Sequence, residues 1–374
     1  MKKETRIIGA VCMVGLLVFV STSCKKNQEN GEMTINVSIP GVETEGDRAY
    51  ITRYGLFMWH EQDFVRIYNL ATEDNAIDSR SSVLTKIGGQ STGYARFRGP
   101  SVGPKLAEGY RVIYPVNMVK GSSGEIEEML WNENRQIFDV SDRQYFHSYE
   151  IPGIHHHSMV DPEAMLMAMK LNKLTDEANL HHMFGVATFC LGAAVGTTVV
   201  VDSVVLQDNV FNIAGEVSAK LHRFALDDSQ GVEHNLNYVW DQFFSNYHGF
   251  TPEFVQDVLT PELEFLGWDP DESTLGKSIT MDCIYEHEDG ELKGVTLGEQ
   301  PEMTNFNFML RPLALSQGFT LTIYLEGYNE PIVLDDTDFT YGGFPCNEQW
   351  GFMWAVKPGS CKTYTLKWPL VLPE

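Results

Sequence analysis

The sequence predicts an all-β protein built from two β-sandwich domains in series. Short alternating or apolar runs, broken by Gly, Pro, Asn and Asp, recur along most of the chain, which is the pattern of sandwich strands. Long apolar stripes at helical spacing are scarce. The length of 374 residues exceeds what one hydrophobic core usually organises, so two domains are expected.

The first 24 residues have the composition of a targeting segment. A basic start precedes an apolar run over 7–20, and small residues stand immediately before Cys24. We expect residues 1–23 to be a lipoprotein signal peptide and Cys24 to be the lipidated first residue of the mature chain. The alternative is an ordinary secretory signal with an incidental cysteine. In either case the mature protein leaves the cytoplasm.

The next segment, 33–40, predicts a strand with one apolar and one polar face. Its alternating apolar residues are Met33, Ile35, Val37 and Ile39. Such a strand is suited to lie in a groove. Residues 41–47 are polar and flanked by glycine, and they end at Arg48, where a trypsin-like protease would cut before Ala49.

The N-terminal domain is expected to cover residues 49–177. Strand patterns occur over 54–59, 64–68 and 109–116. Residues 163–170 fit either a short helix or a strand, and the alternation of their methionines favours a strand.

The C-terminal domain is expected to cover residues 178–374. Residues 184–191 and 197–207 predict a pair of strands joined by a glycine-rich turn, and 211–217 would continue the meander. Between 221 and 273 the periodicity weakens, which indicates a long insertion. A cap and a proline at the first helical position predict a short helix at 251–259 inside it. Further strands are predicted over 306–310, 319–325 and 362–368.

Four cysteines follow Cys24, and export permits them to form disulfides. Cys346 and Cys361 are close in sequence and flank a Trp-rich segment, so they are the expected disulfide pair. Cys190 lies in an apolar run and is expected to be a free buried thiol. The chain has no CxxC spacing, which gives zinc or thioredoxin-like chemistry no support.

The charge and the motifs exclude several classes of function. A formal net charge of −24 repels nucleic acid and anionic lipid headgroups, so we expect no nucleic-acid partner. The sequence contains no catalytic elbow, zinc-protease motif or phosphate-binding loop, so we expect neither an enzyme nor a cofactor. Three consecutive histidines, 155–157, stand near Asp161, but a solvated loop explains them better than a metal site. Trp240 and Tyr247 leave open a second class, a monomeric glycan-binding surface lipoprotein.

Several of these signals occur in one order along the chain. The cysteine at 24 and the alternating strand come first, followed by Asp47-Arg48-Ala49. The later segments are 112–115, 161–168, 180–187, 202–206, 308–312 and 357–364. In this order the chain resembles the fimbrillins, the type V pilin superfamily of Bacteroidales, along nearly its whole length except 221–273.

The resemblance implies two transthyretin-like β-sandwich domains in tandem, with an irregular insertion in the second. It also implies a surface-exposed outer-membrane lipoprotein, the precursor of a structural or adhesive fimbrial subunit. Residues 24–48 would be a lipidated propeptide carrying a removable first strand. An Arg-directed protease would cut after Arg48, with Arg53 as second choice, and leave Ala49 as the new N-terminus.

The partners implied by the resemblance are other pilin subunits in a homo- or hetero-polymer, the outer membrane through the lipid anchor, the protease, and a host or bacterial surface ligand. A strand from a neighbouring subunit would fill the groove that the first strand leaves. The alternating C-terminal residues 364–372 are suited to such a donor.

Overall fold

The computed structural model describes most of the chain as β structure. It describes residues 31–38, 59, 63–71, 80–88, 94–107, 109–114, 135–151, 154–161, 164–171, 173–175, 177–182, 184–220, 263–265, 276–286, 290–311, 314–346, 356 and 361–372. Within these residues the regular elements are strands and one short 3₁₀ helix, η6 (Asp336–Asp338). The all-β prediction is therefore confirmed.

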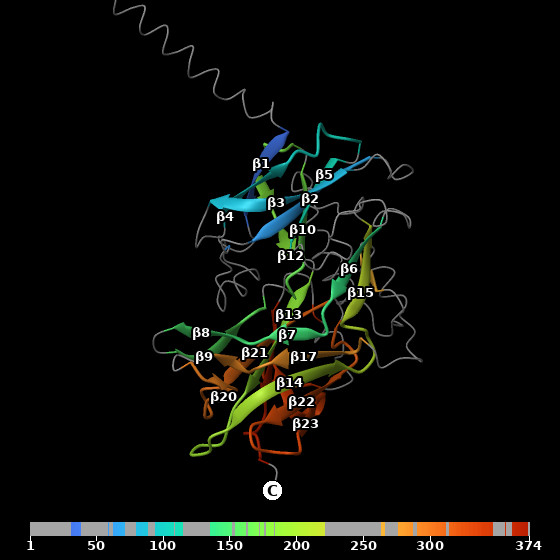
Figure 1. Ribbon diagram of the computed structural model, residues 1–374. Helices are drawn as coiled ribbons and strands as arrows, with labels where there is room; N and C mark the ends of the chain where they lie inside the picture. The colour runs from blue at the N-terminus through green and yellow to red at the C-terminus, as the bar shows by residue number, and fades with distance from the viewer. Residues whose placement is uncertain are drawn as a thin grey trace, which may run out of the picture.

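An eight-stranded sheet lies at one end of the molecule (Figure 1). Its spatial order is β11-β1-β4-β3-β2-β5-β10-β12, and every neighbouring pair is antiparallel except β1 with β11. The strands are β1 (Glu32–Ser38), β2 (Phe64–Leu70), β3 (Arg80–Gly88), β4 (Tyr94–Pro100), β5 (Gly109–Tyr114), β10 (Met167–Leu171), β11 (Glu177–Asn179) and β12 (His181–His182).

Two further sheets form a sandwich in the other half. The seven-stranded sheet, in spatial order, contains β25 (Phe344–Pro345), β24 (Phe339–Tyr341), β26 (Cys361–Leu366), β13 (Gly185–Leu191), β21 (Thr304–Leu310), β9 (Ile154–Met159) and β8 (His147–Ile151). The six-stranded sheet contains β23 (Ile332–Asp335), β22 (Phe319–Leu325), β14 (Val200–Asp208), β17 (Ser278–Asp282) and β7 (Arg143–Tyr145), with β20 (Val295–Thr296) also paired to β14.

Two small sheets complete the described strands. The three-stranded sheet contains β16 (Leu263–Phe265), β15 (Gly215–Lys220) and β6 (Arg135–Val140). The two-stranded sheet contains β18 (Tyr285–Glu286) and β19 (Leu292–Lys293).

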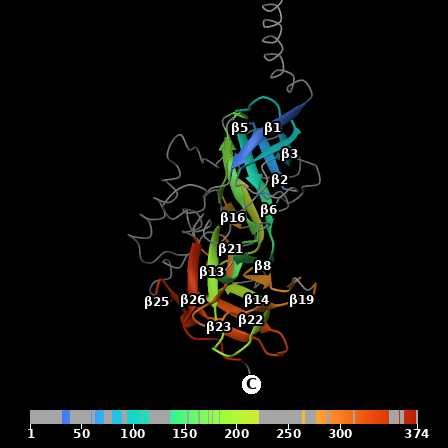
Figure 2. The same ribbon diagram turned by 90° about the vertical axis from the view of Figure 1, so that its left-hand side faces the viewer.

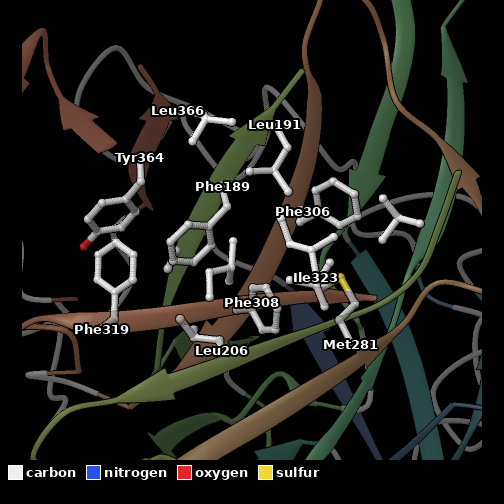
Figure 3. Packing of buried hydrophobic residues seen from close by; sticks show 14 of the residues in the cluster. Phe189, Leu191, Leu206, Met281, Phe306, Phe308, Phe319, Ile323, Tyr364 and Leu366 are labelled. Carbon is white, nitrogen blue, oxygen red and sulfur yellow. The ribbon is translucent and has the colours of Figure 1, made fainter. Parts of the chain in front are cut away.

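The core of the sandwich is rich in aromatic side chains (Figure 3). Phe189 of β13 stacks on Tyr364 of β26 at 5.1 Å and meets Phe319 of β22 edge-on at 5.2 Å. Since Phe319 belongs to the facing sheet, these rings join the two layers. Edge-to-face and offset-stacked pairs add to the stability that burial alone provides.

The eight-stranded sheet has its own buried cluster, built from β1, β2, β4, β5 and β10. This cluster extends into the second half through Phe184, Val186 and Met309. The two halves are arranged end to end, and the C-terminus lies at the far end from β1 (Figures 1 and 2).

The predicted strands within described segments are found, but two pairings differ from expectation. Residues 185–191 and 200–208 do not form a hairpin: β13 pairs with β21 and β26, whereas β14 pairs with β17, β20 and β22. The strand at 215–220 does not continue a meander but pairs with β6 and β16. The turn between them passes from one layer to the other, since β13 and β14 belong to different sheets. Within this turn Ala193 forms bridges with Glu299 and Leu370.

Strands from the expected N-terminal domain also pair with the second half. β7 joins the six-stranded sheet through β17, and β9 joins the seven-stranded sheet through β21. The two buried clusters also interleave along the chain, because Phe146 belongs to the cluster of the sandwich whereas Val186 and Met309 belong to the cluster of the eight-stranded sheet. The division at 177/178 is kept as a proposal.

Candidate functional site: the position of the first strand

The first strand lies inside its sheet and not at the edge. β1 is antiparallel to β4 along its whole length, from Glu32 opposite Pro100 to Ser38 opposite Tyr94. On its other side, residues 36–38 run parallel to β11. The carbonyl oxygen of Gly31 accepts from the Ser101 N–H at 2.6 Å, and that of Ser38 accepts from the Leu180 N–H at 3.0 Å. Hydrogen bonds therefore hold β1 from both sides.

Burial alternates along β1 as the sequence predicts. Met33, Ile35 and Val37 are 8%, 1% and 0% exposed, whereas Thr34 and Asn36 between them are half-buried. Burying three such side chains contributes about 5–9 kcal/mol of gross hydrophobic stabilisation. The fourth expected residue of this face, Ile39, lies outside the described residues.

Small side chains from both neighbours surround the apolar face of β1. On β4, Gly99 stands opposite Met33 and Ala95 opposite Val37. On β11, Ala178 also stands opposite Val37. Between them Phe97 faces Ile35. We call the position bounded by Ala95, Phe97, Gly99 and Ala178 the first-strand site.

The side of this site behind Phe97 is held by contacts that do not involve β1. Trp59 packs edge-on against Phe97 at 5.0 Å and against Tyr114 at 5.2 Å. The Lys86 Nζ donates to the Trp59 carbonyl oxygen at 2.7 Å. Phe97 is thus supported by Trp59, a residue outside β1, which is itself held by Tyr114 and Lys86.

Glycine at position 99 is required by the neighbouring strand β3. A Cβ on residue 99 would lie 2.7 Å from the Val83 carbonyl oxygen and 2.8 Å from Leu84 Cδ2. The sequence pattern does not predict which strands neighbour β1. The signal for β4 was present in the alternation of Ala95 and Phe97 with Arg96 and Arg98.

The expected Cys346–Cys361 disulfide is not formed, and both thiols are free. Cys346 belongs to the core of the sandwich, as do Tyr364 and Leu366 of β26. Cys361 packs instead against the buried cluster of the eight-stranded sheet. The Cys361 Sγ lies 3.2 Å from the Thr188 Oγ1. The two cysteines were close in sequence, but the sheet separates their side chains. Burial raises the pKa of the Cys346 thiol to about 12.

Cys190 and Cys283 are free thiols as well. Cys190 is largely buried on β13, as expected, and burial raises the pKa of its thiol to about 11. A high pKa keeps a thiol protonated and unreactive at neutral pH.

The C-terminal segment is built into its own fold. β26 lies between β24 and β13 in the middle of the seven-stranded sheet. The Leu370 N–H donates to the Gly192 carbonyl oxygen at 2.9 Å. The Leu370 side chain is buried, whereas Trp368 and Val371 are exposed. As a donor, this segment would first have to leave its sheet.

The remaining expected functional residues lie outside the described residues. They are Cys24, Arg48, Ala49, Arg53, Trp240 and Tyr247, together with the helix expected at 251–259. The described part of the chain contains no group of three potential metal ligands. Asp161, the carboxylate near the three histidines, is buried, and its Oδ2 accepts a hydrogen bond from the Tyr145 N–H at 2.9 Å. A helix with the length and hydropathy for crossing a membrane is likewise missing from the described residues.

Comparisons with known proteins give similarities among solved structures. No protein-family model matches, and no curated protein matches. A protein from Bacteroides ovatus, proposed to act in cell adhesion, is 12% identical with a TM-score of 0.42, covering 89% of this chain and 90% of that chain. A fimbrial assembly protein from Parabacteroides distasonis is 6% identical with a TM-score of 0.33, over 89% and 90%. The tip fimbrial protein Mfa3 from Porphyromonas gingivalis is 9% identical with a TM-score of 0.31, over 92% and 95%. This chain is thus similar, along about nine tenths of its length, to Bacteroidales proteins described as fimbrial or adhesive.

Proposed function

We propose that this chain is a structural or adhesive subunit of cell-surface fimbriae. It is made as an outer-membrane lipoprotein precursor, anchored through Cys24. It assembles by donor-strand exchange after proteolysis has removed β1. The observation that carries this proposal is the position of β1, which fills an apolar site between two strands of its own sheet.

The connection of β1 to the fold makes such an exchange feasible. β1 comes first among the described strands, and residues 39–63 link it to β2. A cut after Arg48 would leave β1 held by hydrogen bonds and apolar contacts alone. A strand from another subunit would then pair with β4 and β11 and place alternate apolar side chains over Phe97. Until the cut, β1 covers both strand edges and so prevents premature polymerisation.

The test is cleavage of the purified full-length chain by an Arg-specific protease. We expect a new N-terminus at Ala49 and, after cleavage, a ladder of oligomers on electrophoresis without heating. The Arg48→Ala variant should resist cleavage and remain monomeric. The matched variant Arg53→Ala should behave as the parent chain.

A parent chain that is cut at Arg48 and stays monomeric would contradict the proposal. A parent chain that resists the protease at Arg48, stays monomeric and binds glycans would favour the alternative, an uncleaved surface glycan-binding lipoprotein. The anchor is tested separately, because Cys24→Ser should abolish incorporation of a labelled fatty acid.

A further inference from the structure

The outward face of β4 carries two neighbouring arginines. Arg96 and Arg98 are two residues apart on one strand, so their side chains leave the same face of the sheet. Both are exposed, and they stand opposite Asn36 and Thr34 of β1. We call Arg96 and Arg98 the basic face. It adjoins the first-strand site on the solvent side.

The outward face of the six-stranded sheet carries three carboxylates. Asp282 of β17 is paired with Ser203 of β14, and Asp202 occupies the irregularity of β14 just before Ser203. Glu326 follows β22, and its N–H donates to the Val200 carbonyl oxygen at 3.0 Å. These pairings bring the three carboxylates to one region of the sheet. Partial burial, and then the charges of Glu326 and Asp282, raise the pKa of Asp202.

Two exposed tyrosines flank this cluster. Ser203 pairs with Tyr324 on one side, and Asp282 pairs with Tyr145 on the other. The tyrosines are 45% and 47% exposed. We call Asp202, Asp282 and Glu326, with the flanking Tyr145 and Tyr324, the acidic face. Arginine is the cation that suits it best, because a guanidinium both pairs with carboxylates and stacks on tyrosine rings.

Among the described residues, opposite charges lie beside both faces without pairing with them. Beside the basic face these are the exposed Glu32 and Glu177, which share the outward side of the sheet with Thr34 and Asn36. In the described part of the chain, the arginines of the basic face and the carboxylates of the acidic face form no ion pair.

Two described cations lie near the acidic face. Arg143 stands opposite Thr280, two residues before Asp282 on β17. Lys293 precedes Gly294, where a Cβ would lie 2.9 Å from the Asp202 Oδ1, but its ammonium pairs with Glu291 at 2.8 Å. Two faces of opposite sign are therefore available for an external partner.

The two faces belong to opposite ends of the molecule. Figure 1 shows β4 in the first sheet at one end, with β14, β17 and β22 in the sandwich at the other. The faces of one copy cannot meet each other, but the basic face of one copy can meet the acidic face of the next. Such a contact uses two different surfaces and leads to a head-to-tail chain of copies.

The net charge of −24 strengthens the choice of a second copy as partner. Most approaches between two such chains are repulsive, so a local basic face opposite an acidic one selects one relative orientation. We propose that the basic face of one copy docks on the acidic face of a second copy and sets the head-to-tail orientation of assembly. This rests on the proposed function, because it names the surfaces that bring subunits together beside the first-strand site.

The test uses sedimentation velocity of the full-length chain before any proteolysis, at low and at physiological ionic strength. We expect weak self-association that salt reduces, since exposed charges are screened. Arg96→Glu/Arg98→Glu should raise the dissociation constant of self-association at least about tenfold. Asp282→Lys/Glu326→Lys should raise it by a similar factor. An equimolar mixture of these two variants should associate again, as should one chain carrying all four substitutions.

The matched control is Lys105→Glu/Glu302→Lys, which reverses two exposed charges away from both faces and should associate like the parent. Circular dichroism checks folding, and the restored association of the mixture excludes misfolding as the cause of the losses. The proposal is overturned if the parent shows no salt-sensitive association, if either variant associates normally, or if the mixture fails to recover. Face-dependent association without polymers after cleavage would instead overturn only the proposed function.

Discussion

The side chain of Gln144 forms two hydrogen bonds with the backbone of Met309. Its Nε2 donates to the Met309 carbonyl oxygen at 2.8 Å, and its Oε1 accepts from the Met309 N–H at 2.9 Å. Gln144 belongs to β7 of the six-stranded sheet and Met309 to β21 of the seven-stranded sheet. The amide thus takes the place of a neighbouring strand at this point. It joins the two layers of the sandwich where the buried cluster of the eight-stranded sheet reaches them.

Loss of the Gln144 amide should destabilise the protein strongly. Gln144→Leu leaves two buried backbone groups of Met309 without partners, and we expect the free energy of unfolding to fall by about 2–5 kcal/mol. Urea denaturation measures this. The matched change Gln207→Leu on the exposed side of β14 should alter the unfolding free energy by less than about 0.5 kcal/mol. Equal effects of the two changes would refute the bridging role.

The apolar face of β1 should contribute to stability, and its polar face should not. Ile35→Ala opens a cavity beside Phe97, so we expect a loss of about 2–5 kcal/mol in urea denaturation. Thr34→Ala removes a half-buried polar side chain from the opposite face and should cost less than about 0.5 kcal/mol. If Ile35→Ala were tolerated as well as Thr34→Ala, β1 would not be an integral part of the core.

Position 99 should accept no side chain, although position 88 should. Gly99→Ala places a methyl group against the Val83 backbone, and we expect a destabilisation of about 1–3 kcal/mol from overpacking. A Cβ at Gly88 would meet nothing within 4 Å, so Gly88→Ala should be close to neutral. Thermal denaturation of the two variants measures the difference. Destabilisation by Gly88→Ala alone would contradict the described pairing of β3 with β4.

The carboxylate cluster should make stability depend on pH in a defined direction. The pKa of Asp202 is raised in the folded state, so between its unfolded and folded pKa values the folded chain binds more protons. The contribution of Asp202 to the unfolding free energy therefore rises as pH falls through the folded pKa. Asp202→Asn should stabilise the protein at pH 7, and this gain should disappear in acid, where both residues are neutral.

Urea midpoints of the parent and of Asp202→Asn, compared near neutral pH and near pH 3, measure this dependence. Asp142→Asn serves as the control, because Asp142 is an exposed carboxylate outside the cluster. A gain from Asp202→Asn that persisted in acid would have another origin than the burial of the Asp202 charge and its repulsion by Glu326 and Asp282.

Local patterns were sufficient to locate many strands. The clean alternation at 319–325 corresponds to β22, and the alternation at 362–368 corresponds largely to β26. The ambiguous residues 163–170 overlap strand β10. These predictions succeed because alternation in sequence maps directly onto the two faces of a strand.

The pairing partners of the strands could not be predicted from these local patterns, because pairing depends on contacts between distant parts of the chain. The strands at 185–191 and 200–208 are adjacent in sequence and each has strong strand propensity, yet they lie in different layers. The glycine-rich turn between them permits a hairpin but does not impose one. What decides the outcome is the burial of Phe189 against Tyr364 and Phe319, which come from residues more than a hundred positions later.

The sequence by itself determined that this is an all-β chain and that its first strand has one apolar and one polar face, since both follow from local periodicity. Only the tertiary structure decided that this strand lies between β4 and β11, that Cys346 and Cys361 stay apart, and that basic and acidic faces occupy opposite ends. The physical reason is that hydrogen-bond partners, sheet faces and charge neighbours are fixed by long-range packing, which local periodicity does not encode.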